Sequence, residues 1–308
     1  MSISTPLPLI ETNSKSPQRL QDIHVAYLLV LPALALLLGI IIYPLLNSMY
    51  IGLLDKSLVY GGNDFVGLQN LRSVLNSDFL PILSNTLVFA LAATILPFII
   101  GFIVALLLNA STRAMGILRG AFLLPWLVPS VIASFLWLWI FNANYGVLNG
   151  ILRNLGLIDQ NVNWLSTANS AMAAVLIAKT WQTFPWIAIM ILAGLQTIPS
   201  ELLDAAAIDG ANRLNRFLKI TLPHLQSVIS VVLLLSLIWN FQHFETIYVM
   251  TRGGPAKATT TFSVAVYQTA FQAFDLGKAG ALGILWMVLL SFVVVVYLRF
   301  GMSSEENY

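Results

Sequence analysis

The sequence predicts an all-α, polytopic membrane protein with six transmembrane helices, and three observations carry that prediction. Charged residues make up 9% of the 308 residues, against roughly 25% in a soluble domain. The mean hydropathy is +0.84. Six stretches nearly free of charge are each long enough for a helix to cross a bilayer, which takes about 20 residues. They are residues 23–54, 79–112, 120–152, 160–195, 220–244 and 279–298.

The chain begins with a segment that is expected to lie outside the membrane. Residues 1–21 are rich in Ser, Thr and Pro, which predicts a disordered tail that turns helical after Pro17. The first span follows within residues 23–54, where Pro32 and Pro44 are expected to kink the helix.

A polar loop at residues 55–78 separates the first two spans. Its Gly-Gly-Asn-Asp run at 61–64 is expected to form a turn, and a short helix is expected near 68–75. The second span is expected over residues 85–108.

The remaining spans are expected over residues 121–141, 171–195, 226–250 and 279–298. Pro125 and Pro129 fall inside the third span. A long loop at 142–167 precedes the fourth, and an amphipathic run at 262–274 precedes the sixth. Residues 302–308 form a short tail.

Residues 200–225 form the one long polar insert with helical character. Ser200 is expected to cap a short helix whose first turn carries Glu201, where a carboxylate suits the positive end of the helix dipole. Gly210 costs about 1 kcal/mol relative to Ala inside a helix, so it predicts a break. A second helix is expected to end at Pro223. Three basic residues are expected on one side of it: Arg213, Arg216 and Lys219.

This insert resembles the EAA loop of permease subunits of ATP-binding cassette (ABC) importers. The resemblance rests on Asp204-Ala205-Ala206, Gly210 and Ile220-Thr221-Leu222-Pro223 at the family's spacing, with Asp where Glu is usual. It implies a type I ABC importer transmembrane domain over residues 22–301, with a coupling loop at 200–225 that docks into a cytoplasmic ATPase subunit. The residues that it implies for this docking are Asp204, Ala205, Ala206, Asp209, Gly210 and Ala211.

Two outer loops are similar to those of carbohydrate-uptake permeases of the maltose type. They contain Asn144-Tyr145-Gly146-Val147-Leu148-Asn149 and Thr251-Arg252-Gly253-Gly254-Pro255, the latter followed by Thr259-Thr260-Thr261, Tyr267 and Phe271. The resemblance implies half of a translocation pore for a sugar, either a disaccharide or a small glycoside. It also implies three kinds of partner: a second, related permease in a heterodimer, two ATPase subunits that bind ATP and Mg²⁺, and an extracytoplasmic sugar-binding protein.

Polar residues inside the apolar spans are the candidates for substrate contact. Ser236, Trp239, Asn240 and His243 fall on one helical stripe, which would offer hydrogen bonds beside a flat aromatic surface, as a neutral sugar needs. By resemblance, Ser236 and Asn240 match residue types that line the family's sugar site, and His243 stands where an amide is expected. Thr183 and Trp186 are also implied by resemblance. The alternative for all six is interhelical hydrogen bonding and packing.

Lys179 and Glu245 are the charged residues within or near the spans. They are expected either to pair with each other or to bind substrate hydroxyls, with the alternative that Glu245, near the outer end of its span, simply reaches water. One Lys and one Glu favour a neutral solute over glycerol phosphate or a polyamine, the alternative cargoes of the same family. A proton relay through Glu245, His243 and Lys179 would instead suit an ion-coupled carrier acting alone.

Other classes are excluded or disfavoured. The sequence has no Walker loop, no paired-histidine metal motif and no supported Ser/His/Asp constellation, so no enzyme activity and no cofactor in this chain are expected. Net charge +2 with scattered Lys and Arg predicts no nucleic-acid partner. Basic residues are denser on the side that would carry the 200–225 loop, which predicts a multi-pass protein of the inner (plasma) membrane with both termini in the cytoplasm.

Overall fold

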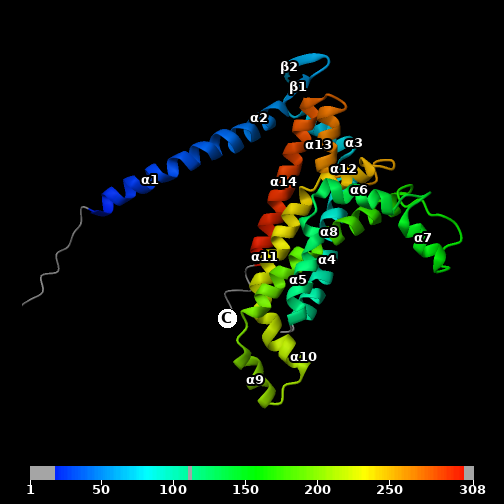
Figure 1. Cartoon of the computed structure of the whole chain (residues 1–308). Coiled ribbons are helices and arrows are strands. Elements are labelled where there is room, and N and C mark those ends of the chain that lie inside the picture. Colours follow the sequence, from blue (N-terminus) through cyan, green and yellow to red (C-terminus); the bar gives the residue numbers. More distant parts are fainter. Residues whose placement is uncertain (1–17, 110–112, 302–308) are drawn as a thin grey trace, which may run out of the picture. The chain divides into compact units, whose positions relative to one another are not determined.

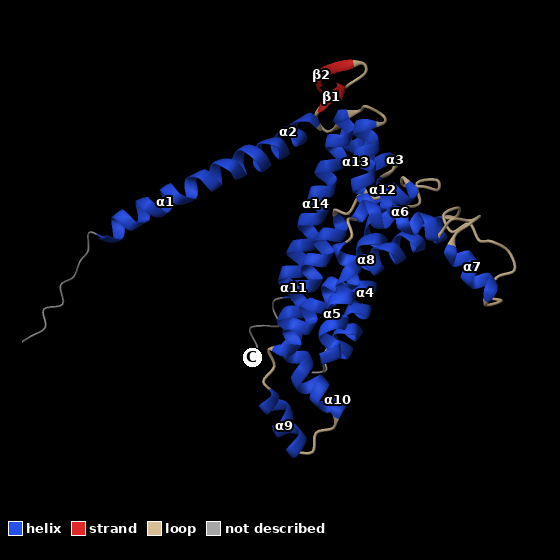
Figure 2. Ribbon diagram, viewed as in Figure 1, coloured by secondary structure: helices blue, strands red, loops and turns tan. Residues whose placement is uncertain are grey.

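The computed structural model describes residues 18–109 and 113–301, and within them it is helical apart from one β-hairpin (Figures 1 and 2). The chain divides into two compact units, Met1–Tyr50 and Ile51–Tyr308. Most of the expected N-terminal tail, residues 1–17, and the expected C-terminal tail, 302–308, lie outside the described residues.

The first unit is one long apolar helix. It consists of α1 (Gln18–Leu37), a π-helical turn (Leu38–Ile42) and α2 (Tyr43–Ile51), whose last residue belongs to the second unit. The chain stays helical through Pro32, and the wider π-helical turn directly precedes α2, which contains Pro44. A π-helical turn accommodates the amide hydrogen bond that proline cannot make. The expected first span is therefore confirmed as a helix, without an interruption at either proline.

The second unit opens with the hairpin formed by β1 (Leu54–Ser57) and β2 (Gly61–Phe65). The prediction of a turn at 61–64 is wrong, because these residues pair in β2 and the turn precedes them. Gly62 has φ +104°, and a Cβ there would meet the carbonyl oxygen of Asp55. Glycine at position 62 therefore lets β2 lie close to β1, and it is not part of the turn. The predicted short helix is α3 (Gln69–Ser77).

Four long helices form the body of the second unit. They are α4 (Phe79–Leu108), α8 (Ala168–Gln196), α11 (Leu222–Phe241) and α14 (Leu276–Gly301). Helix α4 packs on α8 and α11, and α11 also contacts α8 and α14. At Gly101 a Cβ would lie 2.8 Å from the carbonyl oxygen of Phe184, so the absent side chain lets α4 and α8 approach closely.

The third predicted span is not straight. It is divided into α5 (Arg113–Leu127) and α6 (Ser130–Ile140), which meet at 94°. Pro129 caps α6 and has no amide hydrogen to continue α5, and the Gln182 side chain donates to the carbonyl of Val128 at 2.9 Å. By length and composition, the described residues contain five helices able to span a membrane, or six if this bent pair counts as one.

The fifth predicted span also departs from a single helix over 226–250. Helix α11 ends at Phe241, and α12 (Glu245–Thr251) follows after a break. At the other end, α10 (Arg213–Arg216) and a π-helical turn (Phe217–Thr221) run directly into α11. Pro223 therefore does not end a helix. It follows the π-helical turn within a continuous helical run, and that turn accommodates the hydrogen bond that its missing amide hydrogen cannot make.

Two further short helices belong to the unit. Helix α7 (Val147–Asn154) lies in the loop between α6 and α8, and α13 (Phe262–Phe271) corresponds to the expected amphipathic run. Helix α13 packs on α14 and α4, and its first four residues are buried, so it belongs to the core rather than to a surface loop.

Two apolar clusters stabilise the body at different levels along the same helices. One includes Phe89 of α4, Ala178 of α8 and Ile247 of α12; the other includes Ile187 of α8 and Val232 of α11. Polar residues separate the clusters along each helix: Thr94 on α4, Lys179, Gln182 and Thr183 on α8, and Ser236 and Asn240 on α11. A polar level between two apolar levels is where this fold concentrates its hydrogen-bonding side chains.

Candidate functional site

A cavity of about 280 Å³ lies at this polar level, beside the bend between α5 and α6. The bend, α8 and α11 all contribute to its wall. The lining residues are Trp126, Leu127, Val128, Pro129, Ser130, Lys179, Gln182, Thr183, Trp186 and Trp239. It thus combines three indole rings with hydroxyl, amide and ammonium groups.

Three of the six predicted substrate residues line this cavity. Thr183 and Trp186 come from α8, and Trp239 comes from α11. The rings of Trp186 and Trp239 have centroids 5.0 Å apart and planes inclined at 56°. Trp239 is 51% exposed, so this aromatic pair offers a surface to a ligand.

The other three predicted residues, Ser236, Asn240 and His243, are buried and do not line the cavity. Asn240 donates to the carbonyl of Ala93 at 2.9 Å and to the hydroxyl of Thr94 at 3.1 Å, as expected for interhelical hydrogen bonding. The prediction that His243 shares one face of a single helix with Ser236 and Asn240 is wrong, because α11 ends at Phe241.

Three buried polar atoms at this level have no hydrogen-bond partner among the described residues: the Thr180 and Ser236 hydroxyls and the Asn240 side-chain oxygen. A buried polar atom without a partner is costly, so these atoms mark a place where water or another chain completes the structure.

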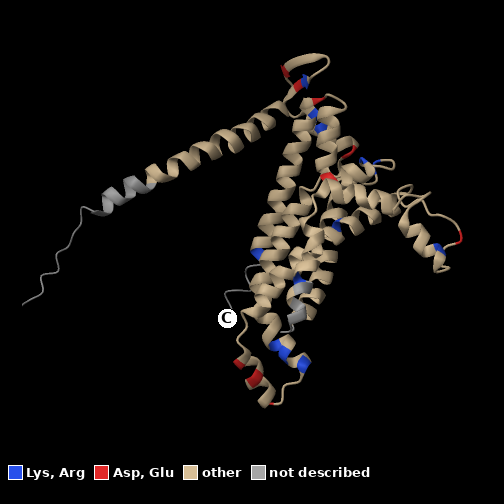
Figure 3. Cartoon of the chain, viewed as in Figure 1, with Lys and Arg blue, Asp and Glu red and all other residues tan. Residues whose placement is uncertain are grey.

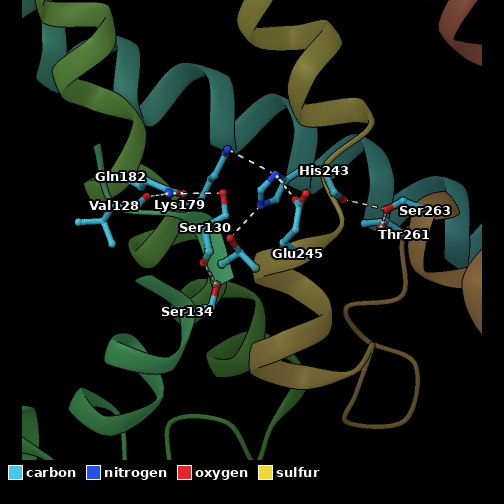
Figure 4. A network of polar contacts seen from close by, with 10 residues as sticks. Val128, Ser130, Ser134, Lys179, Gln182, His243, Glu245, Thr261 and Ser263 are labelled. Carbon is cyan, nitrogen blue, oxygen red and sulfur yellow. Dashed lines mark hydrogen bonds and ion pairs between the residues drawn. The ribbon is translucent and has the colours of Figure 1, made fainter. Parts of the chain in front are cut away.

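His243 joins the two charged residues singled out in the sequence (Figure 4). Its Nδ1 lies 3.4 Å from Lys179 Nζ and 3.5 Å from Glu245 Oε2, and its Nε2 lies 2.8 Å from the Thr246 hydroxyl. The hydroxyl of Ser263 donates to the His243 carbonyl at 2.8 Å and so fixes the chain between α11 and α12. Lys179 and Glu245 make no direct ion pair within 4 Å, contrary to one of the two expectations.

Gln182 and Ser130 were not identified from the sequence. Gln182 Nε2 lies 2.9 Å from the Val128 carbonyl and 3.4 Å from the Ser130 hydroxyl, so it closes the cavity wall at the bend. An amide in an apolar run of α8 is a signal for such a role, but its partner is 54 residues away and cannot be read from local spacing.

The polar insert forms a hook at the end of the second unit that lies farthest from the β-hairpin (Figure 1). Its first helix, α9 (Ser200–Ile208), has Pro199 at the N-cap position, so the expectation that Ser200 caps it is wrong. Gly210 has φ +82°, and the amides of Gly210 and Ala211 donate to the carbonyls of Ala207 and Ala206. This is a Schellman motif, which confirms the expected break at Gly210.

The second part of the hook is tied to the first. The Asn212 side chain caps α10 through the amide of Asn215 at 2.8 Å, and Arg216 Nη1 approaches the Leu203 carbonyl at 3.5 Å. Carboxylates gather on α9 and basic residues on α10 (Figure 3). Ile208, at the end of α9, is 87% exposed.

All six predicted coupling residues are exposed or partly exposed on this hook, and Gly210 also shapes its turn. The hook therefore presents an exposed surface at the residues that the sequence predicts for the coupling loop.

Comparison with known proteins agrees with this arrangement. Residues 97–302 match the model of the family described as "binding-protein-dependent transport system inner membrane component". The chain is 38% identical, over 96% of its length and 100% of the relative, to the trehalose/maltose transport system permease protein MalF of Thermococcus litoralis. It is 36% identical, over 91% of each chain, to the sulfoquinovosyl glycerol transport system permease protein SmoG of Agrobacterium fabrum.

The fold matches a solved structure as well. A chain of a bacterial alginate ABC transporter, in complex with its alginate-bound periplasmic protein, superimposes with a TM-score of 0.81 at 21% identity, covering 94% of this chain and 97% of that one. The predicted type I importer transmembrane fold is thereby confirmed, with its third and fifth spans broken. The chain belongs to the family of inner-membrane permease components of binding-protein-dependent ABC transport systems.

Proposed function

We propose that this chain forms half of the translocation pore of an ATP-driven importer whose cargo is a saccharide delivered by an extracytoplasmic binding protein. The observation that carries the proposal is the cavity between the α5–α6 bend, α8 and α11. Its paired indole rings suit the C–H face of a sugar ring, and Ser130, Thr183 and Gln182 suit hydroxyl groups. The relatives named for trehalose, maltose and sulfoquinovosyl glycerol support the same cargo class.

The proposed assembly has a second permease, which supplies the other half of the pore in a heterodimer, and two ATPase subunits. The ATPase partners dock on the hook through Asp204, Ala205, Ala206, Asp209, Gly210 and Ala211. Ile208 is added as an aliphatic anchor because its side chain has no cover within the described chain. ATP and Mg²⁺ are bound by those subunits and not by this chain.

The hook is well placed to transmit movement to the cavity. It connects the end of α8 at Gln196 to α10, which continues without a gap into α11. Helix α8 carries Trp186, and α11 carries Trp239. Displacement of α9 by a closing ATPase dimer would act on both helices at once, because the Arg216–Leu203 contact ties α10 to α9. Two states of the cavity, each with its own affinity for cargo, follow from such a device.

In this proposal the hook is cytoplasmic, the hairpin and α13 face outward, and both termini lie in the cytoplasm of a cell with an inner membrane. The transmembrane domain is taken as residues 22–301, with the coupling loop at 200–225.

Alternative cargoes are unequally supported. A polyamine is disfavoured because the described cavity lining holds an ammonium and no carboxylate. Glycerol phosphate keeps some support from a relative named sn-glycerol-3-phosphate transport system permease protein UgpA of Pectobacterium atrosepticum, 30% identical over 92% of this chain. An ion-coupled carrier using Lys179, His243 and Glu245 would leave the hook and the family membership without a role.

The proposal is tested by ATP-dependent uptake of radiolabelled saccharides into proteoliposomes that contain the complete complex. Trp186→Ala and Trp239→Ala should each lower uptake up to about tenfold, since stacking on an aromatic ring contributes roughly 0.5–1.5 kcal/mol beyond burial. Trp139→Ala is the matched control, because Trp139 is 73% exposed on α6 and does not line the cavity. Equal effects of all three changes would contradict the saccharide site.

A further inference from the structure

Lys179 is the one charged side chain among the described residues that line the cavity. It projects from α8 at the polar level, between Ala178 in one apolar cluster and Ile187 in the other. An ammonium group inside a membrane domain is costly unless it has a partner, so its placement at the cavity needs an explanation.

Its partners within the chain are weak ones. The closest polar contact is the 3.4 Å approach to His243 Nδ1, and no carboxylate lies within 4 Å. Glu245 approaches the same Nδ1 at 3.5 Å from the opposite side and is 51% exposed by side chain. A neutral imidazole Nδ1 either accepts from Lys179 or donates to Glu245, and it cannot do both.

Glu245 makes no direct ion pair with Lys179. It lies outside the cavity lining, and His243 stands between it and Lys179 (Figure 4). The expectation of a neutral solute counted one Lys and one Glu together, whereas only Lys179 is among the residues that line the cavity.

We propose that Lys179 selects the charge of the cargo, so that the imported saccharide carries an anionic group, either a carboxylate or a sulfonate or phosphate. This inference rests on the proposed saccharide cargo and restricts that cargo to anionic saccharides. The anion would complete the pairing that Lys179 lacks, while Trp186 and Trp239 hold the sugar ring. Charge-assisted hydrogen bonds are roughly twice as strong as neutral ones, and more so away from water.

His243 has a positioning role in this arrangement. Its ring is held by the Thr246 hydroxyl at 2.8 Å, and its Nδ1 faces Lys179 Nζ. The imidazole thus fixes the ammonium of a side chain that lines the cavity, and as a neutral ring it does not cancel the charge.

The test measures binding of three methyl glycosides with the same ring to the complete transporter in nanodiscs. Methyl glucoside is neutral, methyl glucuronide carries a carboxylate, and methyl 6-deoxy-6-sulfoglucoside carries a sulfonate. Binding is followed by intrinsic fluorescence, because Trp186 and Trp239 line the cavity. The proposal predicts that at least one anionic glycoside binds about tenfold more tightly than the neutral one. A preference for only one anion supports it and identifies the group.

Three variants separate charge recognition from packing. Lys179→Gln should weaken the preferred anionic glycoside about tenfold and leave the neutral one within about twofold. Lys179→Arg should retain the preference. Lys278→Gln is the matched control: it removes a lysine that pairs with Asp275 outside this cavity and should change neither affinity.

Each contrary outcome has a distinct meaning. Equal binding of charged and neutral glycosides to the wild type overturns the proposal and leaves the saccharide cargo intact, and this comparison stands even if Lys179→Gln fails to assemble. Equal weakening of both glycosides by Lys179→Gln also overturns it, in favour of a packing role. Failure of all three glycosides to bind rejects the saccharide cargo and this inference together.

Discussion

Gly210 is the residue on which the shape of the hook depends. Its φ of +82° lies in the left-handed region, which glycine adopts without strain and a β-branched residue does not. Empty space surrounds the position at which a Cβ would stand, so a substitution there acts through the backbone and not through a clash.

We therefore predict that Gly210→Val abolishes ATP-driven uptake while the chain still inserts and assembles its core. Backbone strain of about 1–3 kcal/mol would be relieved by opening the Schellman turn, which displaces Ile208 and Asp209. Uptake in proteoliposomes and ATPase stimulation in the same complex measure the effect.

Gly156→Val is the control for that change. Gly156 has φ +68° and also has nothing within 4 Å of its Cβ position, but it lies in the loop after α7. It should carry similar strain without a loss of coupling. Equal loss of uptake in both variants would show that the strain matters and the hook does not.

Several site residues could be anticipated from the sequence, and others could not, for a physical reason. Trp186 and Trp239 stand out because indoles beside polar residues in apolar spans are unusual, and both line the cavity. Asn240 stands out equally, yet its amide is engaged by Ala93 and Thr94 of α4. The sequence shows that a polar side chain lies in an apolar span. Whether its hydrogen-bond partner is another helix or a ligand depends on how α4 packs against α11.

At the scale of elements, the bend between α5 and α6 creates one wall of the cavity. It brings Trp126 and Ser130 to α8, and Gln182 holds it through the Val128 carbonyl. Pro129 predicts a break in the helix. The 94° angle also depends on Gln182 of α8 and so cannot be predicted from the proline alone.

We predict that Gln182→Leu lowers the free energy of unfolding by about 1–3 kcal/mol, because the Val128 carbonyl loses its side-chain donor. The thermal transition of the detergent-solubilised complex measures this. Gln196→Leu, on the exposed end of the same helix, is the matched substitution and should leave the transition unchanged. An identical shift in both would mean that Gln182 does not hold the bend.

The contact between α4 and α8 offers a second test at this scale. Gly101→Val would place a Cβ 2.8 Å from the Phe184 carbonyl and 2.9 Å from the Ile187 side chain. We expect a loss of about 1–3 kcal/mol of stability from overpacking, together with reduced uptake because Thr183 and Trp186 follow α8. Stability is read from thermal unfolding, and uptake from proteoliposomes.

Gly283→Val is the corresponding control for this packing test, since no atom lies within 4 Å of its Cβ position on α14. A similar loss of stability there would indicate a general effect of valine in these helices and would contradict close packing at Gly101.

The division of the fifth span into α11 and α12 shows why helix boundaries were the least predictable part of the fold. Residues 242–244 are Gln-His-Phe and contain no Pro or Gly that would predict a break. The break is stabilised by contacts from elsewhere: Ser263 donates to the His243 carbonyl, and the His243 ring bonds Thr246. Such a break belongs to tertiary structure and leaves no local signature.

At the scale of the whole molecule, the membrane helices and the polar hook between them were predictable from the sequence. Long apolar runs predict membrane helices because hydrocarbon offers backbone groups no partner, and the polar hook is recognisable because it interrupts those runs. The relation between hook and cavity was not predictable. It follows from the continuity of α10 with α11 through Pro223, where the sequence suggested an end.

That continuity is the physical basis of the proposed transport cycle. An ATPase subunit that moves α9 would move α8 and α11 together, and with them Trp186 and Trp239 of the cavity. The account therefore depends on contact between α9 and the ATPase subunit.

The most direct measurement of that contact is cross-linking from single cysteines in the assembled complex, which is simple because the natural chain contains no cysteine. Ile208→Cys places the thiol on the exposed end of α9, and Val59→Cys places one on the exposed hairpin turn, where Val59 is 59% exposed. With a short bifunctional maleimide, the account predicts a covalent permease–ATPase product from Ile208→Cys and none from Val59→Cys. A product from Val59→Cys alone, or labelling of Ile208→Cys by an impermeant reagent added outside the cell, would contradict it.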